Sequence, residues 1–188
     1  MNELLKDELL KNESVVWSGQ PETSILFSKA DLFLVPFSLL WAGMAVFGIG
    51  STLLKSHIRT TQGIMPLFPA VIFIVVAGYI TFGRFIFKNY KKKRTYYFVT
   101  DKRVVVVTNT LNKTVQAEFI DRIPSINKTV NSKGVGSVSF GNSNPASAMY
   151  GNTGMDFFGS YYGQGAPVFY DIKEANKVYD MVNGMRKV

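Results

Sequence analysis

The sequence predicts a helical membrane hairpin followed by a small, mainly β domain that a C-terminal helix closes. Two stretches without Asp, Glu, Lys or Arg, 32–54 and 64–83, support the hairpin. Each can cross a hydrocarbon core about 30 Å thick at roughly 1.5 Å per residue. Short β-branched and aromatic runs with turn residues between them follow from Thr95 onward and favour strands. The 188 residues therefore divide into an N-terminal segment (1–30), a hairpin (31–87) and a domain (88–188).

The N-terminal segment is acidic and carries paired leucines. Within residues 2–12 the pairs Leu4-Leu5 and Leu9-Leu10 fall on one side of a helix, which predicts a short amphipathic helix. Two interpretations stay open, because such a helix can lie on the bilayer surface or pack on the protein's own soluble domain. The acidic start has no uninterrupted apolar core, so a secretory signal peptide is not expected.

The two expected spans cover about 32–54 and 64–87, and a short loop joins them. Pro36 lies near the start of the first span, where proline costs least. Arg84 lies near the end of the second span and has two interpretations. An Arg within a span marks a functional site by default, whereas an Arg at a span end can extend its head towards the interface. Small residues offer surfaces for close helix contact, namely Gly43, Gly48 and Gly50, with Ala42 and Ala45 beside them, and Gly78 and Gly83.

A basic cluster follows the second span and consists of Lys88, Lys91, Lys92, Lys93 and Arg94. Lys29 precedes the first span, whereas the connecting loop holds Lys55 and Arg59 as its cations. The positive-inside rule therefore puts both termini in the cytoplasm. The cluster itself has two interpretations: a signal that sets this topology, and a contact with anionic lipid headgroups.

Six strands and one helix are expected after the hairpin. The strands cover 95–100, 103–108, 113–119, 123–130, 137–140 and 166–170. Asp171 is placed to cap a helix over 172–186. Residues 141–165 form a Gly- and aromatic-rich stretch without Lys or Arg. Because it is too long for an ordinary turn, we expect it to be either disordered or functional.

Three short motifs in this half carry a family resemblance. They are Tyr97 to Val104 (YFVTDKRV), Gly134 to Phe140 (GVGSVSF), and Val168 to Ile172 followed by Val178 to Val182. Together with Trp17-Ser18-Gly19-Gln20-Pro21 ahead of two spans, they resemble the bacterial pleckstrin-homology (PH)-like families of short membrane proteins. The resemblance implies a bent antiparallel sheet that forms a barrel, capped by the C-terminal helix, in a multi-pass protein of a bacterial inner membrane.

Eukaryotic PH domains often bind phosphoinositide headgroups through basic residues around the first strand turn. Here that turn is only Thr100-Asp101-Lys102-Arg103, without a long basic loop, so phosphoinositide binding is not carried over. Contact with anionic lipid is instead expected at the five cations of the basic cluster and at Lys102 and Arg103. Contact with a protein partner is expected at the aromatic residues of the 141–165 stretch, namely Tyr150, Phe157, Phe158, Tyr161 and Tyr162.

No catalytic pattern is visible. The chain has no cysteine and a single histidine, His57, which excludes thiol chemistry, disulfides and Cys-based zinc sites. The zinc-protease HExxH motif, the serine-hydrolase GxSxG motif and the phosphate-binding GxxxxGK[ST] motif are all absent. We therefore expect neither an enzyme nor a bound cofactor or metal.

The leading functional hypothesis is a membrane-anchored, non-enzymatic binding module that contacts protein partners or anionic lipid headgroups. The alternative is a structural subunit or homo-oligomer of a membrane complex, assembled through the spans and the 141–165 stretch. The net charge of +8 lies beyond the hairpin, with 15 Lys/Arg against seven Asp/Glu from Lys88 onward. The anionic leaflet beside the hairpin is the nearest partner for this positive charge. Nucleic-acid binding is not expected, because no recognition element is present.

Overall fold

The computed structural model describes residues 8–25, 27–28, 30–54, 67–142, 151–155 and 165–186. The chain divides into two compact units. The apolar unit is Phe27–Phe87, and the strand-rich unit combines Met1–Leu26 with Lys88–Val188. The residues ahead of the hairpin are therefore grouped with the domain that follows it.

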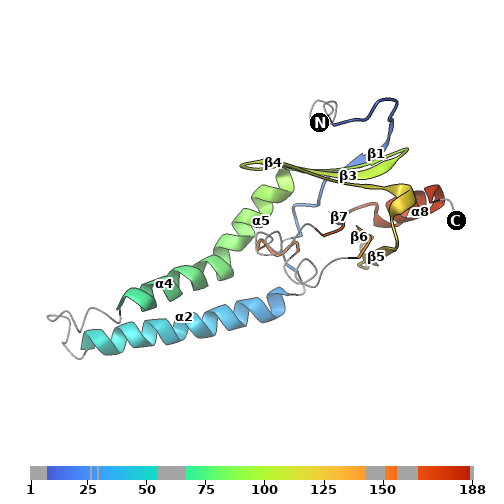
Figure 1. The fold of residues 1–188 in the computed structure, drawn as a ribbon. Coiled ribbons are helices and arrows are strands. Elements are labelled where there is room, and N and C mark those ends of the chain that lie inside the picture. The colour runs from blue at the N-terminus through green and yellow to red at the C-terminus, as the bar shows by residue number, and fades with distance from the viewer. Residues whose placement is uncertain are drawn as a thin grey trace. The chain divides into compact units, whose positions relative to one another are not determined.

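Two long helices form the apolar unit and run side by side (Figure 1). The first, α2, covers Asp31–Leu54. The second runs as α4 (Leu67–Gly78), the π-helical turn η2 (Tyr79–Gly83) and α5 (Arg84–Lys93). By length and composition both are able to span a membrane, over Asp31–Ser51 and Phe68–Lys93. Because α5 continues past the expected end at 87, the basic cluster is helical up to Lys93.

The buried small residues of the hairpin are not the glycines that the sequence suggested. A Cβ atom placed on Gly43, Gly48, Gly50 or Gly78 would meet no atom within 4 Å. Of the predicted small residues Ala45 is buried, and Ala77, Ser38 and Thr81 are the further buried small side chains. Ser38 and Thr81 join the two helices through a hydrogen bond of 2.7 Å between their hydroxyl oxygens.

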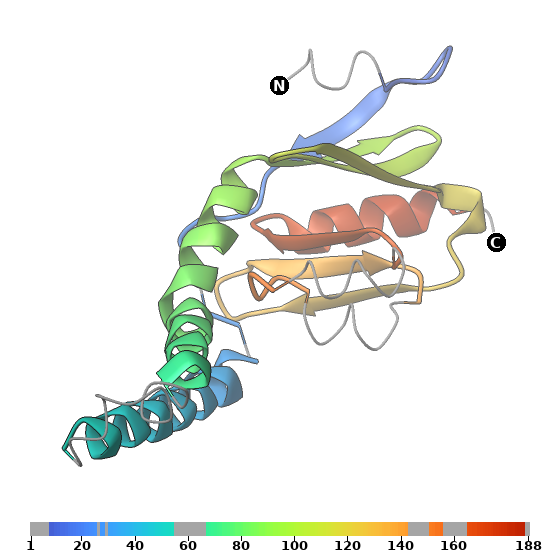
Figure 2. The same cartoon turned by 60° about the vertical axis from the view of Figure 1, so that its left-hand side comes forward.

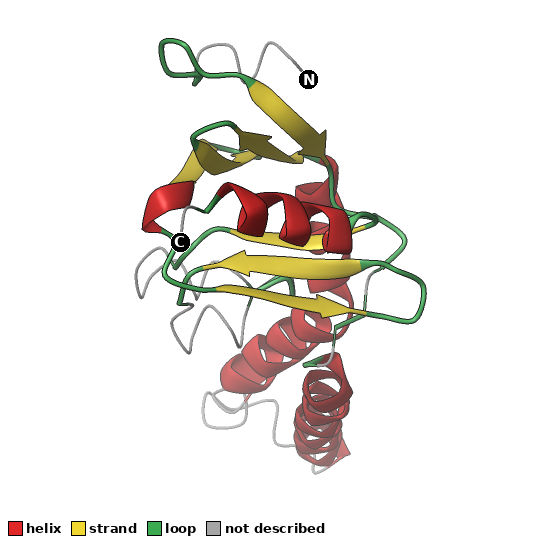
Figure 3. Cartoon of the chain, turned by 90° about the vertical axis from the view of Figure 1, so that its right-hand side faces the viewer, coloured by secondary structure: helices red, strands yellow, loops and turns green. Residues whose placement is uncertain are grey.

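The strand-rich unit contains two antiparallel sheets (Figures 2 and 3). One has the order β1-β2-β3-β4, formed by Val15–Gly19, Thr95–Thr100, Arg103–Asn109 and Lys113–Phe119. After the 3₁₀ turn η3 (Ile120–Arg122), the other has the order β5-β6-β7, formed by Ile126–Val130, Gly136–Phe140 and Val168–Ile172. Helix α8 (Ala175–Met185) follows and packs on β5 and β6.

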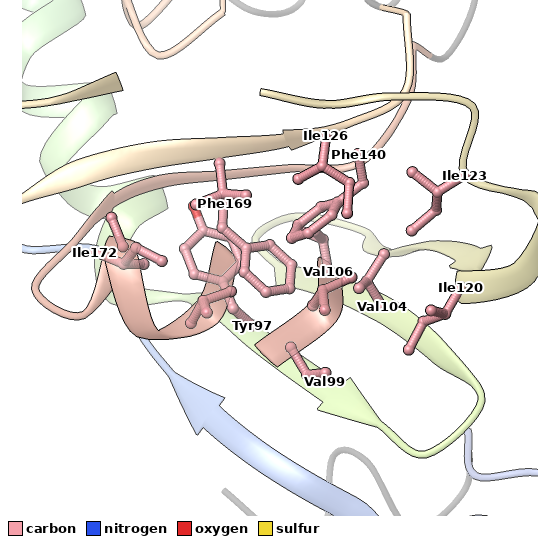
Figure 4. Packing of buried hydrophobic residues seen from close by; sticks show 14 residues of the cluster. Tyr97, Val99, Val104, Val106, Ile120, Ile123, Ile126, Phe140, Phe169 and Ile172 are labelled. Atoms are coloured by element: carbon pink, nitrogen blue, oxygen red, sulfur yellow. The ribbon is translucent and has the colours of Figure 1, made fainter. Parts of the chain in front are cut away.

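The hydrophobic core lies between the sheets and α8 (Figure 4). Tyr97 stacks on Phe169 with ring centroids 4.6 Å apart, and Phe140 meets Phe169 edge-on at 4.8 Å. Alternate residues of the β2–β3 pair face this core, as a half-buried pleated surface requires. Val178 and Val182 of α8 complete it. The predicted C-terminal helix is therefore present and packs on this core, but it covers Ala175–Met185 and begins three residues after its expected start at Ile172.

The barrel predicted for this domain is not closed. In the described part of the chain the strands stay in two separate sheets, and β4 is the last strand of the first sheet. Pro124 has no N–H to donate to a ladder, and the chain turns through η3 before β5 begins at Ile126. The strand expected over 123–130 is shortened for the same reason.

The N-terminal segment also differs from its prediction. Of the amphipathic helix expected over 2–12, residues 8–12 are described, and they form turn and irregular backbone instead of helix. Asn12 lies in the left-handed region at φ 60° and turns the chain into β1. Strand β1 then pairs antiparallel with β2. Trp17 of β1 stacks on Phe169 at 5.9 Å, so its ring belongs to the domain.

Candidate functional site

The basic cluster does not present a uniform cationic surface. Lys88 and Lys92 are only 2% and 4% exposed, whereas Lys93 and Arg94 are exposed. Lys91 is half-buried. Within α5, the exposed Ile86 lies one turn before Tyr90, and the Arg94 guanidinium lies 4.6 Å from the Tyr90 ring centre. Lipid contact by the basic cluster stays a prediction. Lys93 and Arg94 are its exposed members and are the residues able to make that contact.

Lys92 is the centre of a buried polar cluster, which we call the Lys92 cluster. Its ammonium group lies 2.6 Å from the Asp171 carboxylate and donates hydrogen bonds to the Glu22 carbonyl at 2.9 Å and the Ile25 carbonyl. The Asn152 amide donates to the same Asp171 carboxylate at 2.6 Å. The segment before α2, the end of α5, β7 and the short stretch 151–155 therefore meet at one lysine.

Asp171 is consequently not the helix cap that the sequence predicted. It lies inside β7 in the left-handed region, at φ 52°, and Asn152 is left-handed as well, at φ 59°. For residues other than glycine this backbone conformation is unfavourable, and it persists where contacts with the surrounding structure hold it in place. The backbone of Asp171 is held on both sides: its carbonyl accepts from the Glu22 N–H at 2.7 Å, and its N–H donates to Ser137 Oγ at 3.2 Å. Helix α8 begins at Ala175 without a side-chain cap.

The first strand turn is occupied by the N-terminal segment. The Arg103 guanidinium binds both carboxylate oxygens of Glu13, at 2.8 and 3.0 Å, and also donates to the Glu8 carbonyl. Lys102 donates to the Lys11 carbonyl at 3.2 Å. Burial raises the pKa of Glu13, but hydrogen bonds from Arg103, the Leu10 N–H and Thr100 outweigh it and hold the pKa below its ordinary value. Lys102 and Arg103 thus bind this protein's own chain here.

The hairpin contains a buried ion pair of its own. Arg84 is 0% exposed and pairs with Asp31, and its Nε atom donates to the Ile80 carbonyl. Asp31 also accepts from the Ser28 hydroxyl at 2.9 Å at the start of α2. The Arg84 head is therefore buried against the first residue of α2, and an extension of it to the membrane interface stays a prediction. The π-helical turn Tyr79–Gly83 directly precedes Arg84, and such turns often occur at functional sites.

An open groove of about 470 Å³ runs beside β4. One side is formed by Val115, Gln116, Ala117 and Glu118 of that strand. The other side is formed by Pro124, Phe140–Asn142 and Gly165–Pro167. The volume lies within the range of small-molecule and peptide sites. The sequence did not predict this groove, because it depends on the order of strands, in which no described strand pairs with the edge of β4 that faces away from β3.

The predicted partner-contact residues Tyr150, Phe157, Phe158, Tyr161 and Tyr162 lie outside the described residues. Within the described part of the chain, no group of three or more acidic or histidine side chains is placed to hold a metal ion. The sequence signal that could have revealed the Lys92 cluster is weak, because Lys92 looks like any member of a basic run. Comparison with protein-family models, with curated proteins and with solved structures finds no match.

Proposed function

We propose that this chain is a membrane-anchored, non-enzymatic binding module. Its strand-rich unit is a PH-like domain at the cytoplasmic face of a bacterial inner membrane, and it contacts a protein partner or anionic lipid headgroups. The alternative is a structural subunit or homo-oligomer of a membrane complex.

One observation supports the proposal that the hairpin anchors the domain in the membrane. Strand β1 precedes α2 and strand β2 follows α5, and these two strands are hydrogen-bonded neighbours in one sheet. A pair of spanning helices between them must leave from one side of the bilayer and return to it. This agrees with the topology that the positive-inside rule favours.

The lipid contact is supported by the order of side chains along α5. Apolar Ile86 is followed by Tyr90 and then by exposed Lys93 and Arg94. Aromatic rings with a polar end are favoured at the headgroup level, and long cationic side chains extend from there to anionic headgroups. Lys93, the last residue of α5, and Arg94, directly after it, are therefore the residues proposed to meet the leaflet.

The test uses the full chain in nanodiscs that contain zwitterionic lipid with or without anionic phosphatidylglycerol. Native mass spectrometry counts the anionic lipids that stay bound in wild type and in Lys93→Gln/Arg94→Gln. Since each surface cation contributes about 1 kcal/mol of attraction, the double variant is expected to retain anionic lipid about 30-fold more weakly. The matched control is Lys128→Gln/Lys133→Gln, which removes two exposed cations of β5 and the following turn.

Equal retention by wild type and Lys93→Gln/Arg94→Gln would exclude these residues as the lipid contact. Size measurement of the same samples addresses the alternative. A stable homo-oligomer that excludes other proteins would favour the structural-subunit function.

A further inference from the structure

The groove beside β4 follows the edge of the strand and not one of its faces. Successive side chains of a strand point to opposite faces of the sheet. A groove on one face would therefore be lined by every second residue. This groove is lined by four consecutive residues, Val115–Glu118. It consequently runs along the backbone edge of β4, the edge that no described strand covers.

The opposite wall has few hydrogen bonds to offer. Pro124 and Pro167 lack an N–H, and the Phe140 N–H already donates to the Pro167 carbonyl at 3.0 Å. The Gly141 N–H donates to the Ser125 carbonyl at 2.8 Å. Gly141 lies at φ 120°, and a Cβ atom there would come within 3.0 Å of the Ala166 Cβ. Among the described residues, one wall therefore carries a strand edge that pairs with no strand, and the other holds two prolines and two N–H groups that are already paired, beside Asn142.

A single charge lines the groove. Glu118 is its one ionisable lining residue, and within the described part of the chain no cation pairs with it. A carboxylate at the edge of a groove favours a ligand with a cation at the matching position.

From these observations we propose that the groove binds an extended segment of a partner protein. The segment adds to the β4 edge as a fifth strand of the first sheet, with a Lys or Arg facing Glu118. Strand addition is an established mode of peptide recognition, in which main-chain hydrogen bonds supply affinity and alternate side chains supply specificity. Four residues at about 3.4 Å each span about 14 Å, so the core of the segment is four to five residues long. This inference rests on the proposed function and names its protein partner's chemistry.

The first experiment places a photo-crosslinking amino acid at Ala117 in the full chain, in its own membrane. The control has the same amino acid at Asn127, an exposed position on β5 that does not line the groove. The expected result is an adduct specific to Ala117 whose mapped segment is extended and holds a Lys or Arg. An Ala117 pattern equal to that of Asn127, an adduct within this same chain, or an adduct with a helix would overturn the proposal.

The second experiment uses the mapped segment as a synthetic peptide with the full chain in nanodiscs. N-methylation of alternate peptide residues removes donors without changing the protein, so protein misfolding cannot produce the result. We expect at least tenfold weaker binding for the methylation pattern that faces β4, and little change for the opposite pattern. Glu118→Gln is expected to weaken binding about two- to fivefold, the range of a solvent-exposed ion pair. Equal binding of both methylated peptides would overturn strand addition.

The two proposals fail separately. If the Ala117 adduct is absent but lipid retention still depends on Lys93 and Arg94, the groove inference fails and the proposed function stands. Loss of both removes the binding module itself.

Discussion

Two buried ion pairs among the described residues, Arg84 with Asp31 and Lys92 with Asp171, both take their cation from α5 and are built differently. Arg84 has a planar, forked head and joins one carboxylate, Asp31, on the neighbouring helix. Lys92 has a compact ammonium group and gathers one carboxylate and two backbone carbonyls from segments that are not helical. The difference follows from side-chain chemistry, because a guanidinium suits a planar partner and an ammonium suits several acceptors around a point.

The surroundings of the two pairs differ as well. Arg84 and Asp31 lie in helices whose other inward residues are apolar or small. An unpaired charge there is costly because its surroundings are mainly apolar, although Asp31 also accepts from the Ser28 N–H and hydroxyl. The Lys92 cluster holds a second donor for Asp171, the Asn152 amide. Both carboxylates therefore keep a second donor, and the two pairs differ in burial: the Asp31 side chain is 2% exposed, whereas the Asp171 side chain is 14% exposed.

The largest expected effect comes from breaking the hairpin pair. Arg84→Met leaves the Asp31 carboxylate buried without its cation, which costs about 3–5 kcal/mol of unfolding free energy. The measurement is unfolding of the full chain by SDS in mixed micelles. Asp31→Leu combined with Arg84→Met removes both charges and should recover most of the loss. A double variant as unstable as Arg84→Met would contradict this explanation.

The second effect comes from Lys92→Met, which keeps the length of the side chain and removes its charge. Because the Asp171 side chain is partly exposed and Asn152 still binds it, we expect a smaller loss, about 2–3 kcal/mol. Hydrogen exchange should rise in 20–25, 151–155 and 168–172 before it rises in β2 and β3. Lys93→Met, at the exposed neighbouring position, is the matched control. Equal exchange in the two variants would show that Lys92 does not hold these segments together.

A third ion pair, Glu13 with Arg103, is expected to stabilise the fold in a way that depends on pH. The folded-state pKa of Glu13 is lowered, so its contribution is present above the unfolded pKa and is lost as pH falls through the folded pKa. Hydrogen bonds to charged groups contribute about 1.5–3 kcal/mol when buried, and less here because Arg103 is partly exposed. The stability difference between wild type and Glu13→Gln should therefore shrink towards zero below about pH 4. A difference that grows on acidification would contradict the sign.

Local patterns in the sequence were sufficient for the regular elements. β4 occupies the predicted 113–119 and β2 the predicted 95–100, because alternation and β-branched residues are properties of the segment itself. α2 begins one residue before its predicted start, at Asp31. That residue looked like a flanking acid, and its pairing with Arg84, 53 positions away, depends on how the two helices pack.

The candidate sites depended on the same kind of long-range information. Lys92 and Lys93 are indistinguishable as letters in a basic run, yet one is buried and the other exposed. Helical phase separates them once α5 is known to continue to Lys93. The β4 groove required the strand order and the early turn at Pro124. Asp171 fits a helix-cap pattern, but contacts with Lys92, Asn152 and Glu22 hold it in a left-handed strand conformation instead.

Cysteine labelling tests most directly the proposal that the domain lies on the cytoplasmic side of a membrane that the hairpin crosses twice. Because the chain has no cysteine, single cysteines report position directly. One variant, Ser56→Cys, puts a cysteine in the sequence between the two helices. The other, Asn127→Cys, puts a cysteine at an exposed position of β5. In intact spheroplasts a membrane-impermeant maleimide should label Cys at position 56 at once and at position 127 only after the membrane is permeabilised. Labelling of both positions before permeabilisation, or of position 127 alone, would contradict the claim.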